Sequence, residues 1–334
     1  MKKFLPTILL VLVCLGGYWY ASSQNFFQEK QDDAAKPLVQ AQASDLQQVK
    51  IESACGTVEL VKQGEAWQMT QPQPYPVNKY MVDSWLGAFS MLSYDTKVDE
   101  QPKDLAEFGL DKPMLQLEAK LADGTSKKVL VGNALPVAGS YYAKLDGDPA
   151  VYSISETALQ SLGKQAVDFA EKNAVSVDYN KVKRLDVSWK GTAWSLTKKD
   201  AAKAAYESAW TLGEKELKAE NGTIPLDKLT TLSSEELPKA AAQVKLDNPE
   251  LKVEVKEGGA DGAETASVYV GKVEGSVVWV AKQGGAWAYP VPMDAVQALA
   301  DAKADAEAAE AAAAASPSPS PAAGAPSPSA SPVP

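Results

Sequence analysis

The sequence predicts an α+β protein of two tandem, duplicated modules, each a mostly antiparallel sheet with a packed helix, behind a single N-terminal transmembrane helix. Three observations lead to this prediction. A motif at residues 101–113 recurs at residues 237–249, apolar and polar residues alternate along both copies, and an uncharged apolar run precedes them. A chain of 334 residues is long enough for two domains of ordinary size.

The recurring motif matches without a gap at six positions, each separated by 136 residues. The matches are Pro102/Pro238, Lys103/Lys239, Ala106/Ala242, Leu110/Leu246, Asp111/Asp247 and Pro113/Pro249. An internal repeat governs the fold prediction, because each copy is one structural unit. We place the first module at residues 45–165 and the second at residues 175–300.

Strands and helices follow from the spacing of apolar residues. Strict alternation along residues 115–121 and a return at 129–131, around Asp123-Gly124, predicts a hairpin, and residues 251–271 predict its counterpart. Apolar residues spaced by three and four predict one helix with a single apolar face; they are Val82, Trp85, Leu86, Phe89 and Leu92. We expect each module to end in a short helix, near Leu159 and near Val296.

The apolar run from Phe4 to Tyr20 follows two lysines and ends in three aromatic residues, which is typical of a helix that spans a membrane. The lysines stay in the cytoplasm, so the bulk of the chain is predicted on the periplasmic side. A cleavable signal peptide is the alternative, because Ala21-Ser22-Ser23 offers small residues to a signal peptidase. The predicted anchor therefore occupies residues 1–21.

Two further segments flank the modules. Residues 22–44 are polar and glutamine-rich, which predicts a tether between the anchor and the first module. Residues 301–334 predict the end of an alanine-rich helix followed by a disordered Ser/Pro/Ala tail.

Composition excludes several classes of function. The chain has no histidine, which removes the commonest general base and metal ligand. Cys14 falls in the predicted anchor, so Cys55 is the only cysteine of the exported part, and thiolate metal sites within one chain are excluded. A net charge of -10 argues against a nucleic-acid partner. We assign no catalytic, cofactor-binding or metal-binding residue and expect no cofactor.

Four patterns were weighed as sites and interpreted as structure. Ser161 and Lys164 have the spacing of a serine–lysine pair but lack its companion motifs. Asp146 and Asp148 flank a glycine and predict a turn, as do Asp111 and Asp247, whose carboxylates would accept backbone hydrogen bonds. Most of the aromatic residues are predicted to lie in the core; the set is Trp67, Trp85, Tyr141, Tyr142, Trp194, Trp210, Trp279 and Trp287. Asn221-Gly-Thr223 fits a glycosylation acceptor and receives no role.

The anchor, the hairpin that ends in Trp67, and the stretch Phe108-Gly-Leu-Asp-Lys-Pro113 followed by a strand and Val131-Gly132 resemble the bacterial family called domain of unknown function 4340. The resemblance extends over most of residues 45–299 and is weaker in the second module, where Val244-Lys245 replaces Phe108-Gly109. It implies a membrane-anchored exported protein that accompanies ABC-type transport components, and it supplies no catalytic residues.

The sequence thus favours a non-enzymatic, membrane-tethered binding or assembly protein outside the cytoplasm, with a protein partner in the envelope. Two alternatives stay open. One is a hydrolase of envelope polysaccharide or peptide that uses two carboxylates, one of them in an apolar pocket. The other is a structural spacer.

Overall fold

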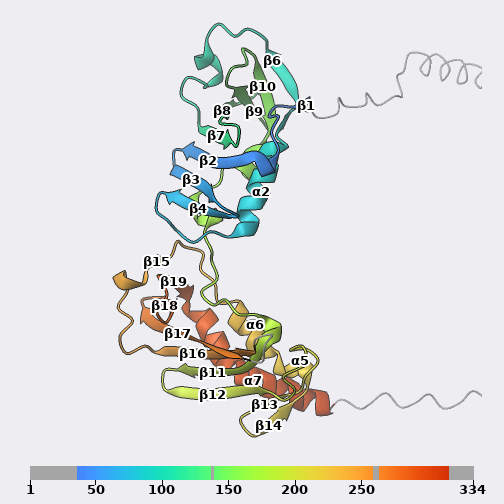
Figure 1. The fold of residues 1–334 in the computed structure, drawn as a ribbon, viewed down its shortest axis with the longest axis vertical. Helices are drawn as coiled ribbons and strands as arrows, with labels where there is room; N and C mark the ends of the chain where they lie inside the picture. Colours follow the sequence, from blue (N-terminus) through green and yellow to red (C-terminus); the bar gives the residue numbers. More distant parts are fainter. Residues whose placement is uncertain (1–35, 137–138, 259–262, 316–334) are drawn as a thin grey trace, which may run out of the picture. The chain divides into compact units, whose positions relative to one another are not determined.

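The computed structural model describes residues 36–136, 139–258 and 263–315 (Figure 1). The chain divides into two compact units, unit 1 up to Ala170 and unit 2 from Glu171. The predicted anchor, the first part of the tether and the Ser/Pro/Ala tail lie outside the described residues. Among the residues that are described, no helix is long and apolar enough to cross a membrane.

Unit 1 contains an eight-stranded sheet in the order β4-β3-β2-β7-β8-β9-β10-β6, in which every neighbouring pair is antiparallel. The strands are β2 (Leu46–Ser53), β3 (Gly56–Gln63), β4 (Ala66–Gln71), β6 (Thr96–Asp99), β7 (Leu115–Leu121), β8 (Ser126–Ala134), β9 (Ser140–Leu145) and β10 (Val151–Ser155). A separate pair joins β1 (Lys36–Pro37) to β5 (Ser93–Tyr94). The predicted hairpin at residues 115–131 is β7 and β8.

The main helix of unit 1 is α2 (Lys79–Ser90), whose first turn is capped by the Asn78 side chain. Its apolar face packs on the sheet as the spacing predicts, and Leu92 is buried just beyond its end. Trp85 is 2% exposed and donates from Nε1 to the carbonyl of Leu162 at 2.9 Å. The shorter helices are η1 (Ala43–Asp45), η2 (Leu105–Phe108), α3 (Glu156–Leu162) and α4 (Ala166–Phe169).

Gly132 on β8 permits a close approach that any side chain would prevent. A Cβ at this position would lie 2.1 Å from the carbonyl oxygen of Phe108. The Phe108 ring in turn meets Tyr142 of β9 edge to face, with ring centroids 5.0 Å apart. The glycine therefore lets the 3-10 helix η2 lie directly on the sheet.

Unit 2 contains a nine-stranded antiparallel sheet in the order β14-β13-β12-β11-β16-β17-β18-β19-β15. The strands are β11 (Val182–Trp189), β12 (Thr192–Lys198), β13 (Trp210–Leu212), β14 (Lys215–Leu217), β15 (Lys239–Ala240), β16 (Leu251–Gly258), β17 (Glu264–Glu274), β18 (Val277–Lys282) and β19 (Trp287–Pro292). The helices are η3 (Tyr179–Lys181), α5 (Ala219–Gly222), α6 (Ile224–Thr230), η4 (Ala241–Gln243) and α7 (Met293–Ala315).

The two sheets share one strand order, with β14 as the additional strand of unit 2. The cross-strand partners also correspond at the separation of 136 residues found in the sequence. In unit 1, Val49 pairs with Leu60 and Ala119, and in unit 2, Leu185 pairs with Leu196 and Val255. A register shift follows Leu46 in β2 and Val182 at the same place in β11. Residues can therefore be compared between units by strand position.

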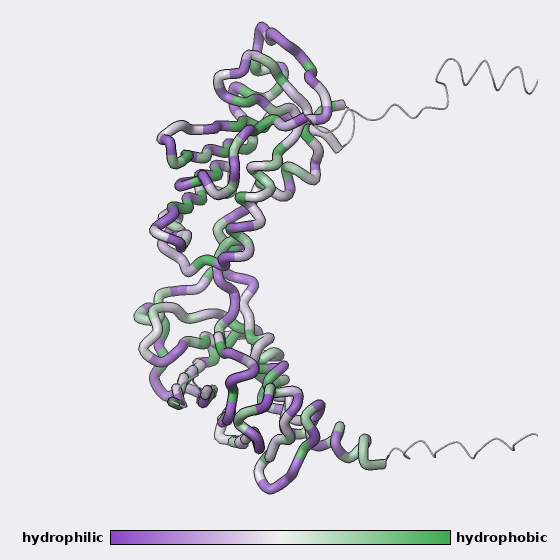
Figure 2. The backbone as a smooth tube through the Cα atoms, turned by 45° about the vertical axis from the view of Figure 1, so that its right-hand side comes forward, coloured by the Kyte–Doolittle hydropathy of each residue, from purple (hydrophilic) through white to green (hydrophobic). Residues whose placement is uncertain are grey.

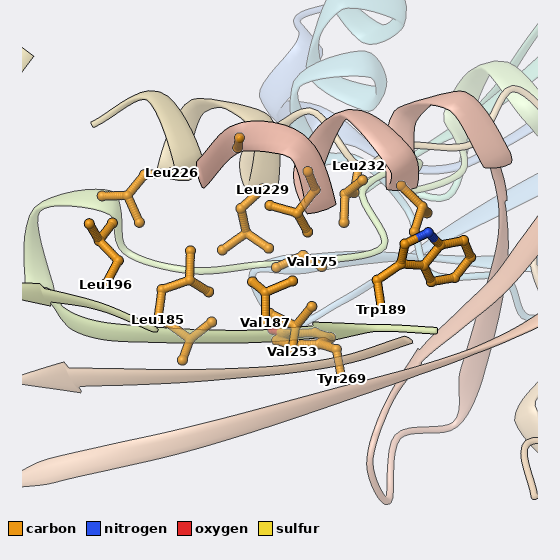
Figure 3. Packing of buried hydrophobic residues seen from close by; sticks show 14 of the residues in the cluster. Val175, Leu185, Val187, Trp189, Leu196, Leu226, Leu229, Leu232, Val253 and Tyr269 are labelled. Atoms are coloured by element: carbon orange, nitrogen blue, oxygen red, sulfur yellow. The ribbon is translucent and has the colours of Figure 1, made fainter. Parts of the chain in front are cut away.

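Each sheet buries alternate side chains under its helices, and stretches of opposite hydropathy alternate along both units (Figure 2). In unit 2, Leu185, Val187 and Val253 project from the sheet toward Leu226 and Leu229 of α6 (Figure 3). This alternation confirms the α+β prediction of mostly antiparallel sheets with packed helices.

Two details differ from the sequence prediction. Residues 36–44 are not part of a free tether, because Leu38 and Val39 are buried and hydrogen-bond to the carbonyl of Leu92. The predicted module end at residue 300 falls inside α7, whose Ala302 and Ala306 are fully buried. Ala302 and Ala306 lie one helical turn apart on α7, so this first part of the alanine-rich stretch belongs to the core of unit 2.

Candidate functional site

Ser161 and Asp148 have structural roles in the fold. The hydroxyl of Ser161 donates to the carbonyl of Thr157 one helical turn earlier, at 2.8 Å. The carboxylate of Asp148 accepts from the Ala150 N–H at 2.9 Å and from the Tyr152 hydroxyl at 2.8 Å. These hydrogen bonds hold the pKa of Asp148 below its ordinary value. Asp148 therefore stabilises the turn between β9 and β10.

The repeated Leu-Asp pairs lie in bends, but the predicted role of their aspartates is wrong. Asp111 and Asp247 are exposed, and within the described residues neither carboxylate has a hydrogen-bond partner. In unit 1 the cap is supplied by Asp104, which accepts from the Ala106 N–H at 2.9 Å. The buried partner of the pair, Leu110, is 3% exposed, so packing of the leucine accounts for this part of the motif.

Asn221 is unavailable as a glycosylation acceptor in this fold. Its side chain is buried and donates from Nδ2 to Glu310 of α7 at 2.7 Å, while Glu310 also accepts from the Lys218 N–H. Cys55 is exposed and free. Within the described ranges, no three Asp, Glu or Cys side chains gather as a metal site would require.

The aromatic residues separate into two groups. Trp85, Trp194, Trp210 and Trp279 are at least 92% buried, as core residues are. Tyr141, Tyr142, Trp67 and Trp287 are half-buried. Of this second group, Trp67 lines a pocket of unit 1.

This pocket, here called the unit 1 pocket, has a volume of about 500 Å³. One wall is the end of the sheet, with Lys62, Glu65, Ala66 and Trp67 at the turn from β3 to β4. The opposite wall is α2 and the residue that precedes its cap, through Val77, Lys79, Asp83 and Leu86. Ala43 and Ser44 of η1 close one end.

The chemistry of the unit 1 pocket is mixed. Val77, Leu86 and the Trp67 ring provide apolar surface, while Lys79 and Asp83 form an exposed ion pair at 2.5 Å. Lys62 lies directly across from Trp67 in the β3–β4 pairing, so an ammonium group and an indole N–H share one face. The pocket can therefore offer hydrogen-bond donors beside an apolar surface, the combination typical of ligand sites.

The strand pairing of unit 2 identifies the counterparts of these residues. Lys198 of β12 pairs with Trp210 of β13 as Lys62 pairs with Trp67. The environment is opposite, because Lys198 is 6% exposed and Trp210 is fully buried. The same lysine and tryptophan positions are thus open in unit 1 and closed in unit 2.

The loop at residues 199–209 closes the site in unit 2. Lys198 donates to the carbonyl of Lys203 at 2.9 Å and to the carbonyl of Asn180 at 2.9 Å. Trp210 donates from Nε1 to the carbonyl of Ala205, also at 2.9 Å, and Ala205 is fully buried. Burial lowers the pKa of Lys198. Backbone carbonyls from the loop therefore satisfy both donors.

A position that lines the unit 1 pocket also differs between the units. Tyr179 of η3 occupies the position of Ala43 in η1, and its hydroxyl donates to Asp227 of α6 at 2.7 Å. Burial and the neighbouring Asp227 carboxylate raise the pKa of Tyr179 to about 12. In unit 1, Ala43 at this position lines the pocket.

The sequence prediction did not identify this site, although a signal was present. Four residues separate Lys62 from Trp67, whereas eleven separate Lys198 from Trp210. Reading that difference as an open and a closed site requires the strand pairing, which places Lys198 on the core face beside Leu196.

A smaller hollow of about 210 Å³ lies on the opposite face of the unit 2 sheet, over β11, β12 and β16. Its carboxylate Asp186 is held by two hydrogen bonds from Arg184, at 2.7 and 2.8 Å, which keep the pKa of Asp186 below its ordinary value. Because the Asp186 carboxylate is already paired with Arg184, it is less available to a ligand than the polar groups of the unit 1 pocket are.

The model of the family described as "Domain of unknown function (DUF4340)" matches residues 67–231. The matched segment begins at Trp67 on β4 and ends at Thr231 after α6, so it includes both tryptophans but not Lys62, and it is narrower than the resemblance seen in the sequence. A search of curated proteins found no match, and a search of solved structures found none either.

Proposed function

We propose that this chain, which resembles the domain of unknown function 4340 family, is a non-enzymatic binding or assembly protein tethered to a membrane outside the cytoplasm. Its two units are copies of one duplicated module, and residues 4–20 anchor them. The partner is an envelope protein, and a component of an ABC-type transporter is the partner that the family resemblance favours.

The observation that carries the binding proposal is the difference between the two lysine–tryptophan sites. In unit 2 the chain satisfies both donors with its own loop carbonyls. In unit 1 the corresponding residues line a pocket of about 500 Å³. A duplicated module that keeps its donors but loses the covering loop is suited to receive another molecule there.

The geometry gives no comparable support to hydrolysis. The acids of the unit 1 pocket, Glu65 and Asp83, are both exposed, and Asp83 is paired with Lys79. Glycoside hydrolysis by two carboxylates requires one of them in an apolar setting that raises its pKa. We therefore propose no catalytic function.

Location can be tested through Cys55, which is exposed and free. In cells producing the Cys14→Ser variant, a membrane-impermeant maleimide should label Cys55 without lysis of the inner membrane, and the protein should remain in the membrane fraction after alkaline extraction. The double variant Cys14→Ser/Cys55→Ser is the control for background. Labelling only after lysis would reject the extracytoplasmic location.

Binding can be tested by photo-crosslinking from the unit 1 pocket in cells. The Ser44→p-benzoylphenylalanine variant should give a discrete adduct, because Ser44 is exposed at the pocket. The Gln68→p-benzoylphenylalanine variant is the matched control, since Gln68 is exposed on β4 but does not line the pocket. Adding Ala43→Tyr, which introduces the residue found in unit 2, should abolish the adduct. Equal adducts from positions 44 and 68 would contradict a role for the pocket.

A further inference from the structure

We propose that the unit 1 pocket binds a short, turn-forming peptide segment supplied by another protein, with a small residue against Trp67 and with backbone carbonyls that accept hydrogen bonds from Lys62 and Trp67. The inference rests on the proposed binding function and specifies its ligand. It is drawn from the loop that occupies the corresponding site in unit 2.

The donors of unit 1 are available for such a ligand. Within the described residues, neither Lys62 Nζ nor Trp67 Nε1 has a hydrogen-bond partner in the protein. Their counterparts Lys198 and Trp210 donate to the carbonyls of residues 203 and 205, two positions apart on one segment. A ligand that replaces the loop must therefore present two carbonyl oxygens with the same spacing.

The loop also indicates what kind of residue the site accepts. Ala205 is fully buried, and the segment around it forms two hydrogen-bonded turns, with the Lys203 N–H donating to Asp200 and the Glu207 N–H donating to Ala204. Small side chains allow the backbone to approach the indole ring closely. The peptide class is thus a turn with a small residue at the position of Ala205, whereas larger residues are accepted where the loop is exposed, as at Lys203, Tyr206 and Glu207.

The charge of the unit 1 pocket agrees with a peptide backbone as the ligand. The charges of Lys62 and Lys79 are balanced by those of Glu65 and Asp83, so the pocket lining carries no net charge. A strongly anionic or cationic ligand would find no excess of opposite charge there. A neutral carbonyl group can accept from Lys62 without requiring a second ion.

The ligand must come from outside unit 1, because the four-residue turn at 63–66 is too short to reach over Trp67 as the loop at 199–209 reaches over Trp210. The chain's own residues 316–334, which lie outside the described residues, are an alternative source. Prolines alternate along much of that stretch, and each proline lacks the backbone N–H that a hydrogen-bonded turn such as those of residues 200–207 requires. We therefore assign the segment to another protein.

The test uses the purified full chain and an acetylated, amidated peptide with the sequence of residues 199–209. With 15N-labelled tryptophan, addition of the peptide should shift the indole signal of Trp67, which is assigned by its loss in Trp67→Phe. Trp67→Phe and Lys62→Met should each weaken binding by about 3- to 10-fold, the effect of one lost hydrogen bond. Lys112→Met, an exposed lysine before β7, should leave the affinity unchanged.

Two further measurements test whether the pocket requires a small residue and whether its ligand comes from another protein. A peptide in which the alanine corresponding to Ala205 is replaced by glutamate should bind at least about 10-fold more weakly, because the charge would lie against the indole ring. Equal binding of both peptides would overturn the proposal. A chain ending at Ala315 should bind the peptide as the full chain does; a tighter affinity together with a shifted Trp67 signal would assign the pocket to the chain's own tail and overturn the external source.

Failure of this inference can be distinguished from failure of the proposed function. A specific photo-adduct from Ser44 in cells without any effect of the peptide on Trp67 would reject the peptide ligand and leave the binding function intact. Absence of both results would reject the two proposals together.

Discussion

Unit 1 and unit 2 place a lysine and a tryptophan at the same two strand positions, but the connection between those positions differs in length, and Tyr179 replaces Ala43. With four intervening residues the pair borders a pocket, whereas with eleven it is buried under Ala205. The comparison indicates that a longer loop between two paired strands can cover a site that stays open where the loop is short. Each of the following experiments alters one side of the comparison.

The largest expected effect is truncation of the buried tryptophan. Trp210→Ala should lower the free energy of unfolding by about 3–5 kcal/mol, because it leaves a cavity in the core of unit 2. Trp67→Ala should cost only about 1 kcal/mol, since its half-buried ring loses less contact. Urea denaturation monitored by circular dichroism measures both. Equal losses would mean that Trp67 is as well covered in solution as Trp210.

Exchange of the loop should convert the closed site to an open one. Replacing residues 199–209 by the sequence Gln-Gly-Glu-Ala of residues 63–66 removes the carbonyl partners of Lys198 and Trp210 and should cost about 2–4 kcal/mol. Acrylamide should then quench additional tryptophan fluorescence. If the quenching stays at the level of the unaltered chain, the loop is not what covers Trp210.

Substitution of two glycines by alanine should change stability by smaller amounts and in opposite directions. Gly222→Ala should destabilise unit 2 by about 1–3 kcal/mol, because the new Cβ would lie 2.3 Å from the Trp210 ring. Gly87→Ala should stabilise unit 1 by about 0.5–1 kcal/mol, since Gly87 lies within α2 and a Cβ there would meet nothing within 4 Å. Thermal unfolding of the two variants should therefore shift in opposite directions, and a shared direction would contradict the packing described for Trp210.

The smallest expected effect is the contribution of Tyr179 to the pH dependence of stability. The pKa of Tyr179 is raised to about 12 in the fold, from an ordinary value of 10.0, so its neutral form is favoured by folding. Its contribution to stability should be complete below about pH 10 and be lost as the pH rises toward 12. Tyr179→Phe should reduce the pH dependence of the urea midpoint in that range. Tyr80→Phe, at a position that is 82% exposed, should leave it unchanged.

Much of the fold could be predicted from periodicity, because burial of one face imposes a regular spacing. The stripe from Val82 to Phe89 is on the buried face of α2, and the alternation of residues 115–121 is β7. Closure of the unit 2 site could not be predicted in this way. Residues 199–209 have no apolar period, and Ala205 is recognisable as a core residue only once the carbonyl that Trp210 contacts is known. Asp111 was misassigned because an exposed aspartate in a bend and a capping aspartate look alike in sequence.

The hydrogen bonds of Glu310 set a limit on how far unit 2 can be shortened from its C-terminal side. This carboxylate accepts from both the Lys218 N–H and the buried Asn221 side chain. A chain cut between Ala306 and Glu310 would leave that amide buried without an acceptor, at a cost of about 1–3 kcal/mol. A protease that trims α7 from its end should therefore proceed readily to the turn containing Glu310 and slow there.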